Sequence, residues 1–233
     1  LVENVMNQDY LFLNERATIE LIQETLSKEG VTHIPILNDE GCLVDCATQS
    51  SYHNIPLIKP ALDGNELEYV TECIKTGWIS SQGAYVSKFE RSLGEYVGLP
   101  NVLAVSNGTN ALHLALVALG LGPGDEIIVP NFTFIAPVNA VLYIGAKPIL
   151  VDVDPATWTI DVELIEKAIS SKTKAIIPVH LYGQPAAMKK IYEIAENNNL
   201  LVIEDCAEAI GTKYKGQHVG TFGDISAFSF FGN

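Results

Sequence analysis

Two acidic residues stand close together at the end of an apolar run, in the segment LLVIEDCAEAIG. Asp205 ends the run, where burying a carboxylate is costly unless a cation pairs with it. A protonated pyridinium nitrogen is such a cation, and an ion pair to it keeps a pyridine cofactor an effective electron sink. Glu208 would face the same ligand if this segment is helical. The alternative is that Asp205 only caps the following turn.

The segment VSNGTNALHLAL has the features of a phosphate cradle. A strand is expected to end at Ser106 and a helix to begin near Thr109. Gly108 would let the backbone approach a ligand closely, and the free N–H groups of the first helical turn favour an anion. Ser106 and Thr109 offer hydroxyls to the same place, and Ser229 could add another. Residues of these types also occur as plain helix caps, so the segment alone does not decide between the two.

Aromatic residues follow the next apolar run, EIIVP. Phe132 and Phe134 stand where a ligand would lie, and an aromatic ring there can stack on a planar cofactor. Burial of both rings in the core is the alternative. His180 follows a later run, KAIIPV, and could lie in the same crevice.

The segment from Val102 to Phe231 contains the elements that would bring these residues together. Its strand-like runs are VLAVS, EIIVP, PILVDVD, KAIIPVH, LLVIED and ISAFSFF, and its helix-like segments are 110–120, 136–143, 162–170 and 187–198. Apolar strands that alternate with helices predict an α/β fold, with a mainly parallel sheet flanked by helices. Ligands bind beyond the carboxyl ends of such strands, where the candidate residues lie.

Residues 1–53 have a different pattern and predict a small domain of their own, with residues 54–233 as the large one. Ala17–Lys28 is expected to be helical, because its Ile and Leu residues form a partial apolar stripe. GVTHIPIL and CLVDCAT predict two strands joined by the turn NDEG. This arrangement resembles half of a CBS module, a regulatory unit that often binds adenosine nucleotides in pairs. The alternative to this small α+β CBS-like fragment is a remnant that binds no ligand.

Composition limits the other classes of function. The 233 residues carry a net charge of −14 with no cluster of Lys or Arg, so nucleic-acid binding is not expected. The four cysteines, Cys42, Cys46, Cys73 and Cys206, form no zinc-binding set, and we expect reduced thiols, no metal and a cytoplasmic location. No run approaches the ~18 apolar residues of a membrane span, and the first residues are too polar for a signal peptide.

The motifs from about Ile55 to Asn233 resemble the sugar aminotransferases of the DegT/DnrJ/EryC1/StrS family. They are SNGTNALHLAL, PNFTFIAPVNAVLYIGAKPILVDVDPATWTID, AIIPVHLYGQPA, VIEDCAEAIG and GTFGDISAFSFFGN, in the family's order and spacing. The resemblance implies the large domain of fold type I PLP-dependent transferases, with pyridoxal 5'-phosphate (PLP) as cofactor. It also implies a homodimer, with active sites at the subunit interface.

The resemblance implies a role for each matching residue. Asp205 would pair with the pyridine nitrogen, and Glu208 would contact the side of the ring that carries the hydroxyl. Phe134 would stack on the ring. Gly108 and Thr109 match the phosphate-binding turn, and Ser229 matches a later phosphate hydroxyl. The loop formed by Trp78, Ile79 and Ser80 would lie near the substrate.

In this family a Schiff-base lysine directly follows the SFFGN-type run, and here the sequence ends at Asn233. We therefore expect a piece of a longer protein that carries this lysine next, and we expect the 233 residues alone to be inactive. A few relatives have His at that position and act as dehydratases on keto-deoxysugars, so dehydration is an alternative. A nucleotide-sensing protein whose CBS-like part is the working unit is another.

Within the family, GWISSQGAYV, HLYGQPA and SFFGN are typical of a branch that aminates GDP-linked sugars. The implied reaction moves an amino group from glutamate to the 4-keto carbon of a nucleotide-linked deoxysugar, with GDP-4-keto-6-deoxymannose as the expected substrate. Its product would serve the synthesis of cell-surface polysaccharide such as the O-antigen of lipopolysaccharide.

Overall fold

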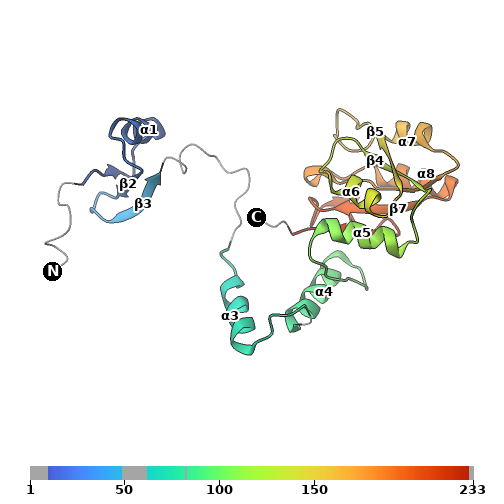
Figure 1. Ribbon diagram of the computed structural model, residues 1–233, viewed down its shortest axis with the longest axis horizontal. Helices are drawn as coiled ribbons and strands as arrows, with labels where there is room; N and C mark the ends of the chain where they lie inside the picture. The colour runs from blue at the N-terminus through green and yellow to red at the C-terminus, as the bar shows by residue number, and fades with distance from the viewer. Residues whose placement is uncertain (1–9, 49–61, 82, 231–233) are drawn as a thin grey trace. The chain divides into compact units, whose positions relative to one another are not determined.

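The computed structural model describes residues 10–48, 62–81 and 83–230. Contacts between Cα atoms divide the chain into two compact units, with the described residues 10–48 in one and 62–81 and 83–230 in the other. The boundary predicted between residues 53 and 54 lies outside the described residues. Each unit has its own sheet (Figure 1). Each also has its own hydrophobic core.

The larger unit contains a sheet of five strands in the order β10-β7-β6-β4-β5. Every pairing between neighbouring strands is parallel, which confirms the predicted α/β fold with a parallel sheet. The strands are β4 (Glu126–Pro130), β5 (Lys147–Val151), β6 (Thr173–Ile176), β7 (Leu201–Cys206) and β10 (Ile225–Phe228).

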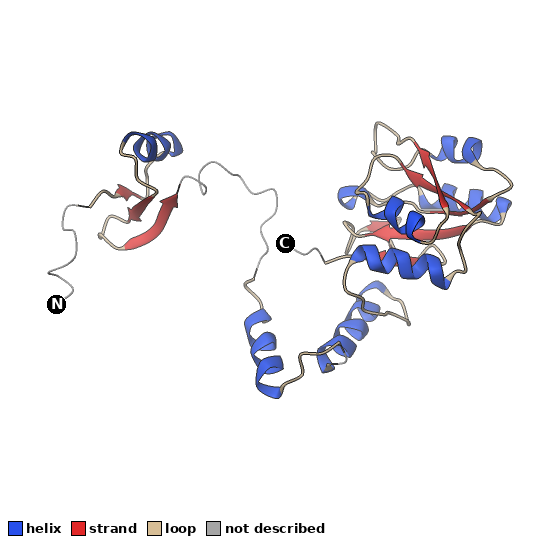
Figure 2. Cartoon of the chain, in the orientation of Figure 1, coloured by secondary structure: helices blue, strands red, loops and turns tan. Residues whose placement is uncertain are grey.

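Helices cover both faces of this sheet (Figure 2). Successive side chains of a strand point to opposite faces. Accordingly, Ile127 and Val129 pack with helices α5 and α6, whereas Ile128 between them packs with α7 and α8. The bounds of these helices are α5 Gly108–Ala118, α6 Ala136–Tyr143, α7 Val162–Ala168 and α8 Met188–Asn198. The strands are apolar on both faces because each face is buried under helices.

The prediction of a strand over VLAVS is wrong, because residues 101–105 have no regular structure. Apolar residues favour a strand, but a strand exists only where its backbone groups pair with a neighbour. This segment and β10, the edge strand, line the same cavity of about 820 Å³. Among the described residues, no strand pairs with the segment.

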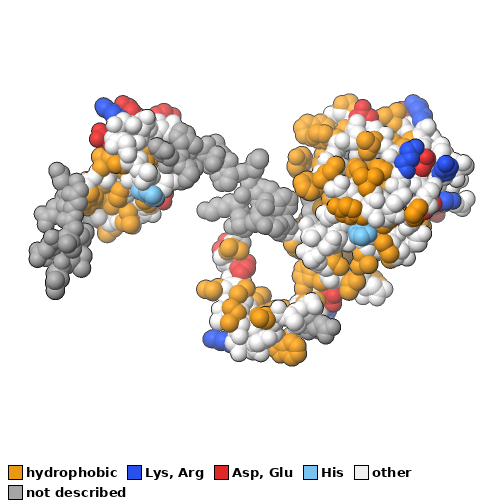
Figure 3. All heavy atoms as spheres, viewed as in Figure 1, with side chains coloured by type: hydrophobic (Ala, Val, Ile, Leu, Met, Phe, Trp, Pro, Cys, Tyr) orange, Lys and Arg blue, Asp and Glu red, His pale blue; other side chains and the backbone are white. Residues whose placement is uncertain are grey.

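Two helices precede this segment. Helix α3 (Glu66–Thr76) buries none of its side chains and exposes Leu67, Val70 and Ile74. Hydrophobic atoms are visible on the surface of this part of the chain (Figure 3). Helix α4 (Ala84–Val97) was not predicted, although its apolar residues recur at helical spacing and Gly98 ends it in the left-handed conformation. A two-stranded hairpin of β8 (Lys213–Tyr214) and β9 (Gln217–His218) completes this unit.

The smaller unit has the helix, strand, turn and strand that the sequence predicts. Helix α1 (Ile19–Lys28) begins two residues later than expected, because the hydroxyl of Thr18 caps it by accepting the N–H of Leu21. Its residues Ile22 and Leu26 pack on the sheet. The sheet has the order β1-β2-β3, with β1 (Leu13–Asn14) parallel to β2 (His33–Leu37) and β2 antiparallel to β3 (Leu43–Thr48).

No helix in the described part of the chain is both long enough and apolar enough to cross a membrane.

Candidate active site

Asp205 is the next-to-last residue of β7 and is held firmly by its backbone. Its N–H donates to the carbonyl of Pro178 at 2.9 Å, and its carbonyl accepts the N–H of His180 at 3.0 Å. The side chain is only 4% exposed, and its Oδ1 accepts the N–H of Ala207 at 3.0 Å. Burial is the main cause that raises the pKa of Asp205 to about 6, and the charge of Glu208 adds to it. The carboxylate is thus poised to gain from a cationic partner.

Glu208 connects the turn after β7 with the turn after β6. Its Oε2 accepts the backbone N–H of Tyr182 at 2.8 Å. Tyr182 has a φ of 49°, in the left-handed region that side chains other than glycine disfavour, and its ring is exposed. The hydrogen bond to Glu208 helps to hold this strained turn beside the carboxyl end of β7.

The start of α5 lies directly against the residue that follows β10. A Cβ added to Gly108 would stand 2.9 Å from the Cβ of Ser229 and 3.1 Å from its Oγ. Asn107 caps the helix by accepting the N–H of Asn110 at 2.8 Å. A serine hydroxyl therefore meets the N-terminal turn of a helix, where free N–H groups favour an anion. Thr109 stands in this same first turn.

Asp205 and Ser229 lie at the same edge of the sheet on neighbouring strands. Asp205 pairs with Ala227 in the parallel ladder of β7 and β10, so Ser229 comes two residues further on. Adjacent strands lie about 4.8 Å apart. The buried carboxylate and the cradle of Gly108 and Ser229 are thus within reach of one planar ligand that carries a phosphate.

The aromatic residues that follow β4 are not core residues. Phe134 is 70% exposed, and Phe132 packs edge-to-face on Trp158 with ring centroids 5.9 Å apart. The alternative that both rings are buried is therefore wrong. Strand β4 lies two positions from β7 in the sheet, with β6 between them, so Phe134 stands at the same carboxyl edge as Asp205.

Trp78, Ile79 and Ser80 lie in the loop between α3 and α4. The residues Trp78 and Ile79 are largely exposed. Their contact with a substrate stays a prediction.

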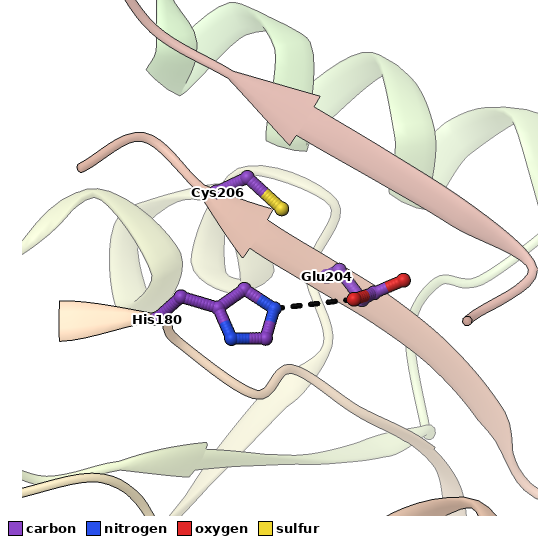
Figure 4. A group of neighbouring side chains, drawn as sticks. All are labelled: His180, Glu204 and Cys206. Carbon is purple, nitrogen blue, oxygen red and sulfur yellow. Dashed lines mark hydrogen bonds and ion pairs between the residues drawn. The ribbon is translucent and has the colours of Figure 1, made fainter. Parts of the chain in front are cut away.

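His180 does not open into a crevice, contrary to the expectation from the sequence. Its side chain is fully buried, next to Glu204 and Cys206 (Figure 4). These three residues offer ligand atoms within 4.8 Å of one another. Nε2 of His180 lies 3.1 Å from Glu204, and Nδ1 accepts the N–H of Ala186 at 3.1 Å. Both ring nitrogens are therefore engaged within the protein, which argues against a metal ion there.

Sequence reasoning missed Glu204, although one signal was available. An acidic residue inside an apolar strand of a sheet covered on both faces must be buried, and a buried carboxylate needs donors. Its three backbone donors lie sixteen to nineteen residues later in the chain, and His180 lies 24 residues earlier, so the sequence alone does not identify them.

A parallel α/β sheet with a candidate anion cradle and a buried carboxylate at its carboxyl edge is typical of a ligand-binding α/β protein. Residues 60–233 match the family model described as the DegT/DnrJ/EryC1/StrS aminotransferase family. The chain belongs to this family.

Two relatives are proteins named GDP-perosamine synthase. The chain is 59% identical over 179 residues to the one from Escherichia coli O157:H7, covering 77% of this chain and 49% of that protein. It is 53% identical over 184 residues to the one from Caulobacter vibrioides, covering 79% and 50%. The chain thus spans about half the length of the curated relatives it matches.

Solved structures of aminotransferases have the same fold. The aminotransferase from Psychrobacter cryohalolentis matches with a TM-score of 0.72 and 41% identity, over 75% of this chain and 45% of that one. The PLP form of a putative sugar aminotransferase, Spr1654 from Streptococcus pneumoniae, matches with a TM-score of 0.73 and 34% identity, over 76% and 49%. Spr1654 has also been solved with pyridoxamine phosphate (PMP).

Proposed function

We propose that the protein is a PLP-dependent aminotransferase that moves an amino group from glutamate to the 4-keto carbon of GDP-4-keto-6-deoxymannose, giving GDP-perosamine. The observation that carries this proposal is the buried carboxylate of Asp205 beside the cradle of Gly108 and Ser229. The identity of 59% to a GDP-perosamine synthase supports the choice of sugar and nucleotide.

The residues of the site fit the ring nitrogen and the phosphate of PLP, because each of these two groups has a complement. Asp205 would hold the proton on the ring nitrogen, since a buried carboxylate with a raised pKa gains most from a cationic partner. The first turn of α5, with Thr109 and Ser229, would bind the phosphate. Only glycine at position 108 leaves room for this approach.

PLP, when bound, supplies a ring that delocalises the electron pair released at the substrate carbon. Asp205 would keep that ring protonated. Phe134, exposed at the same edge, would cover one face of the ring and exclude water from it. Glu208 would fix the side of the ring that carries the hydroxyl, and Trp78, Ile79 and Ser80 would contact the sugar. We expect a lysine directly after Asn233 to move the proton, and a homodimer to complete the site.

The smaller unit is proposed to be a CBS-like fragment. The packing of α1 against the antiparallel pair of β2 and β3 supports this proposal, because the resemblance rests on a helix followed by two strands joined by a turn. Strand β1 is an addition to that pattern. Titration with adenosine nucleotides would test whether it binds them.

Incubation of the full-length protein with PLP, glutamate and GDP-4-keto-6-deoxymannose tests the proposed reaction. Mass spectrometry should detect a GDP-linked amino sugar, with 2-oxoglutarate as coproduct. Borohydride reduction and peptide mapping should place PLP on the lysine after Asn233. A product that has lost water, with His at that position, would support the dehydratase instead. The UDP-linked 4-keto sugar is the matched control and should react far more slowly.

A further inference from the structure

Glu204 is a fully buried carboxylate on β7 that has donors on both oxygens. Its Oε1 accepts the backbone N–H groups of Phe222 and Gly223 at 2.7 and 2.8 Å. Its Oε2 accepts the N–H of Gly220 at 2.8 Å and lies 3.1 Å from Nε2 of His180. Burial raises the pKa of Glu204, but these hydrogen bonds outweigh it, and the pKa lies below its ordinary value. The group is therefore a buried anion at neutral pH.

The contacts of His180 determine how its ring is oriented. Because Nδ1 accepts the N–H of Ala186, it carries no proton itself. The proton of the neutral ring is then on Nε2, which donates it to Glu204. This assignment of the tautomer follows from the hydrogen bonds on both sides of the ring.

The pair connects three segments that carry the site. Residues 180–186 form the turn whose Tyr182 N–H binds Glu208. Strand β7 carries Asp205, whose carbonyl accepts the N–H of His180. Residues 220–223 lead directly into β10, after which Ser229 follows.

Glu204 itself does not face the ligand. Successive side chains of β7 point to opposite faces, so Glu204 lies on the face opposite to Asp205. Val202 and Ile203, the residues before it, confirm this alternation by packing in different clusters. Any effect of Glu204 on a ligand must therefore act through the backbone that it holds.

We infer that His180 and Glu204 are positioning residues, which set the register of β10 against β7 and thereby the placement of Asp205 relative to Ser229. This inference rests on the proposed function, because it assigns the pair to the PLP site. The hydrogen bond between His180 and Glu204 would thus fix the carboxylate of Asp205 and the phosphate cradle relative to each other. Loss of the bond from His180 to Glu204 would leave part of a buried anion without a donor.

Binding of PMP to the purified protein tests the inference, since it requires no covalent bond. His180→Phe keeps a planar ring but removes the donor to Glu204 and the acceptor of the Ala186 N–H, and it should weaken PMP binding about tenfold or more through misplacement of the site. His180→Gln restores an amide donor and should bind within about threefold of the original protein. Glu126→Gln is the control, because it also changes Glu to Gln but lies at the amino end of β4, away from the site. It should bind PMP with the affinity of the original protein.

The NMR signal of an isotope-labelled PMP ring nitrogen gives a second readout. In the original protein it should be that of a protonated ring, and in His180→Phe and Glu204→Gln it should move toward the unprotonated position. An unchanged PMP affinity and NMR signal in His180→Phe would overturn the inference. A loss of PMP affinity in His180→Gln as large as that in His180→Phe would overturn it as well. Unfolding of His180→Phe without PMP would also overturn it, because the pair would then serve the whole fold. If the original protein itself does not bind PMP, the proposed function fails instead.

Discussion

Gly108 and Ser229 are separated by more than one hundred residues of sequence, yet a methyl group on Gly108 would overlap the side chain of Ser229 at 2.9 Å. This contact brings the first turn of α5 against the end of β10. The proposed anion cradle depends on this close approach, because it needs both elements.

Gly108→Ala should therefore weaken cofactor binding. The added methyl group must push α5 and the residue after β10 apart, at a cost of about 1–3 kcal/mol in the free energy of unfolding. Calorimetric titration should show a clear loss of affinity for PMP and a much smaller change for pyridoxamine, which has no phosphate. Gly122→Ala is the matched control, because its methyl group would meet only the carbonyl of Ile144 at 3.8 Å. Equal affinity of both variants for PMP would contradict the cradle.

Asp205→Asn should make the ligand-free protein more stable at pH 7 while abolishing transamination. The pKa of Asp205 is raised to about 6 in the folded state, so stability is greatest below the unfolded pKa near 4 and is lost as pH rises through about 6. The substitution should remove this penalty, on the order of 2–3 kcal/mol at pH 7.

Urea denaturation of both proteins at pH 7 and pH 4 would measure this difference. The gain from Asp205→Asn should be present at pH 7 and nearly absent at pH 4, since the carboxyl is then largely protonated in the folded state. The amide oxygen of Asn can still accept the N–H of Ala207, so the turn itself is preserved. A variant that is less stable than the original at pH 7 would contradict the raised pKa.

Glu208→Ala should release the turn that holds Tyr182. Loss of the acceptor for the Tyr182 N–H should lower the free energy of unfolding by about 1–2 kcal/mol. In a protein that already carries Tyr182→Gly, the φ of 49° is no longer strained. Adding Glu208→Ala to that protein should therefore lower the free energy of unfolding by less. A double-mutant cycle from denaturant unfolding measures this coupling, and Glu208→Gln, which keeps an acceptor oxygen, is the control. Strict additivity would contradict the connection.

Deletion of residues 1–53 should leave the affinity of the full-length protein for PMP unchanged. All residues of the candidate site belong to the larger unit, and the smaller unit has a core of its own. Fluorescence titration of the shortened protein is the measurement. A loss of tenfold or more in affinity, about 1.4 kcal/mol, would show that the first 53 residues belong to the cofactor site.

The sequence by itself determined the parallel α/β architecture and pointed to several residues of the candidate site. Runs such as EIIVP and LLVIED are apolar at consecutive positions, and this pattern directly reflects strands buried on both faces. Asp205 could be singled out because an acidic residue at the end of such a run needs a partner. The helix start was predicted near Thr109, one residue after its observed start at Gly108, because the residue types that begin a helix act locally.

Only the tertiary structure decided which of these expectations hold in space. The run VLAVS has the composition of a strand but no ladder partner among the described residues, and pairing depends on segments distant in the chain. His180 follows a strand as a site residue would, yet it is buried against Glu204 and is not exposed at the carboxyl edge of the sheet. The four donors to Glu204 come from two loops that the sequence does not connect. Composition and periodicity record local preferences, whereas hydrogen-bond partners and close contacts are fixed only when the chain has folded.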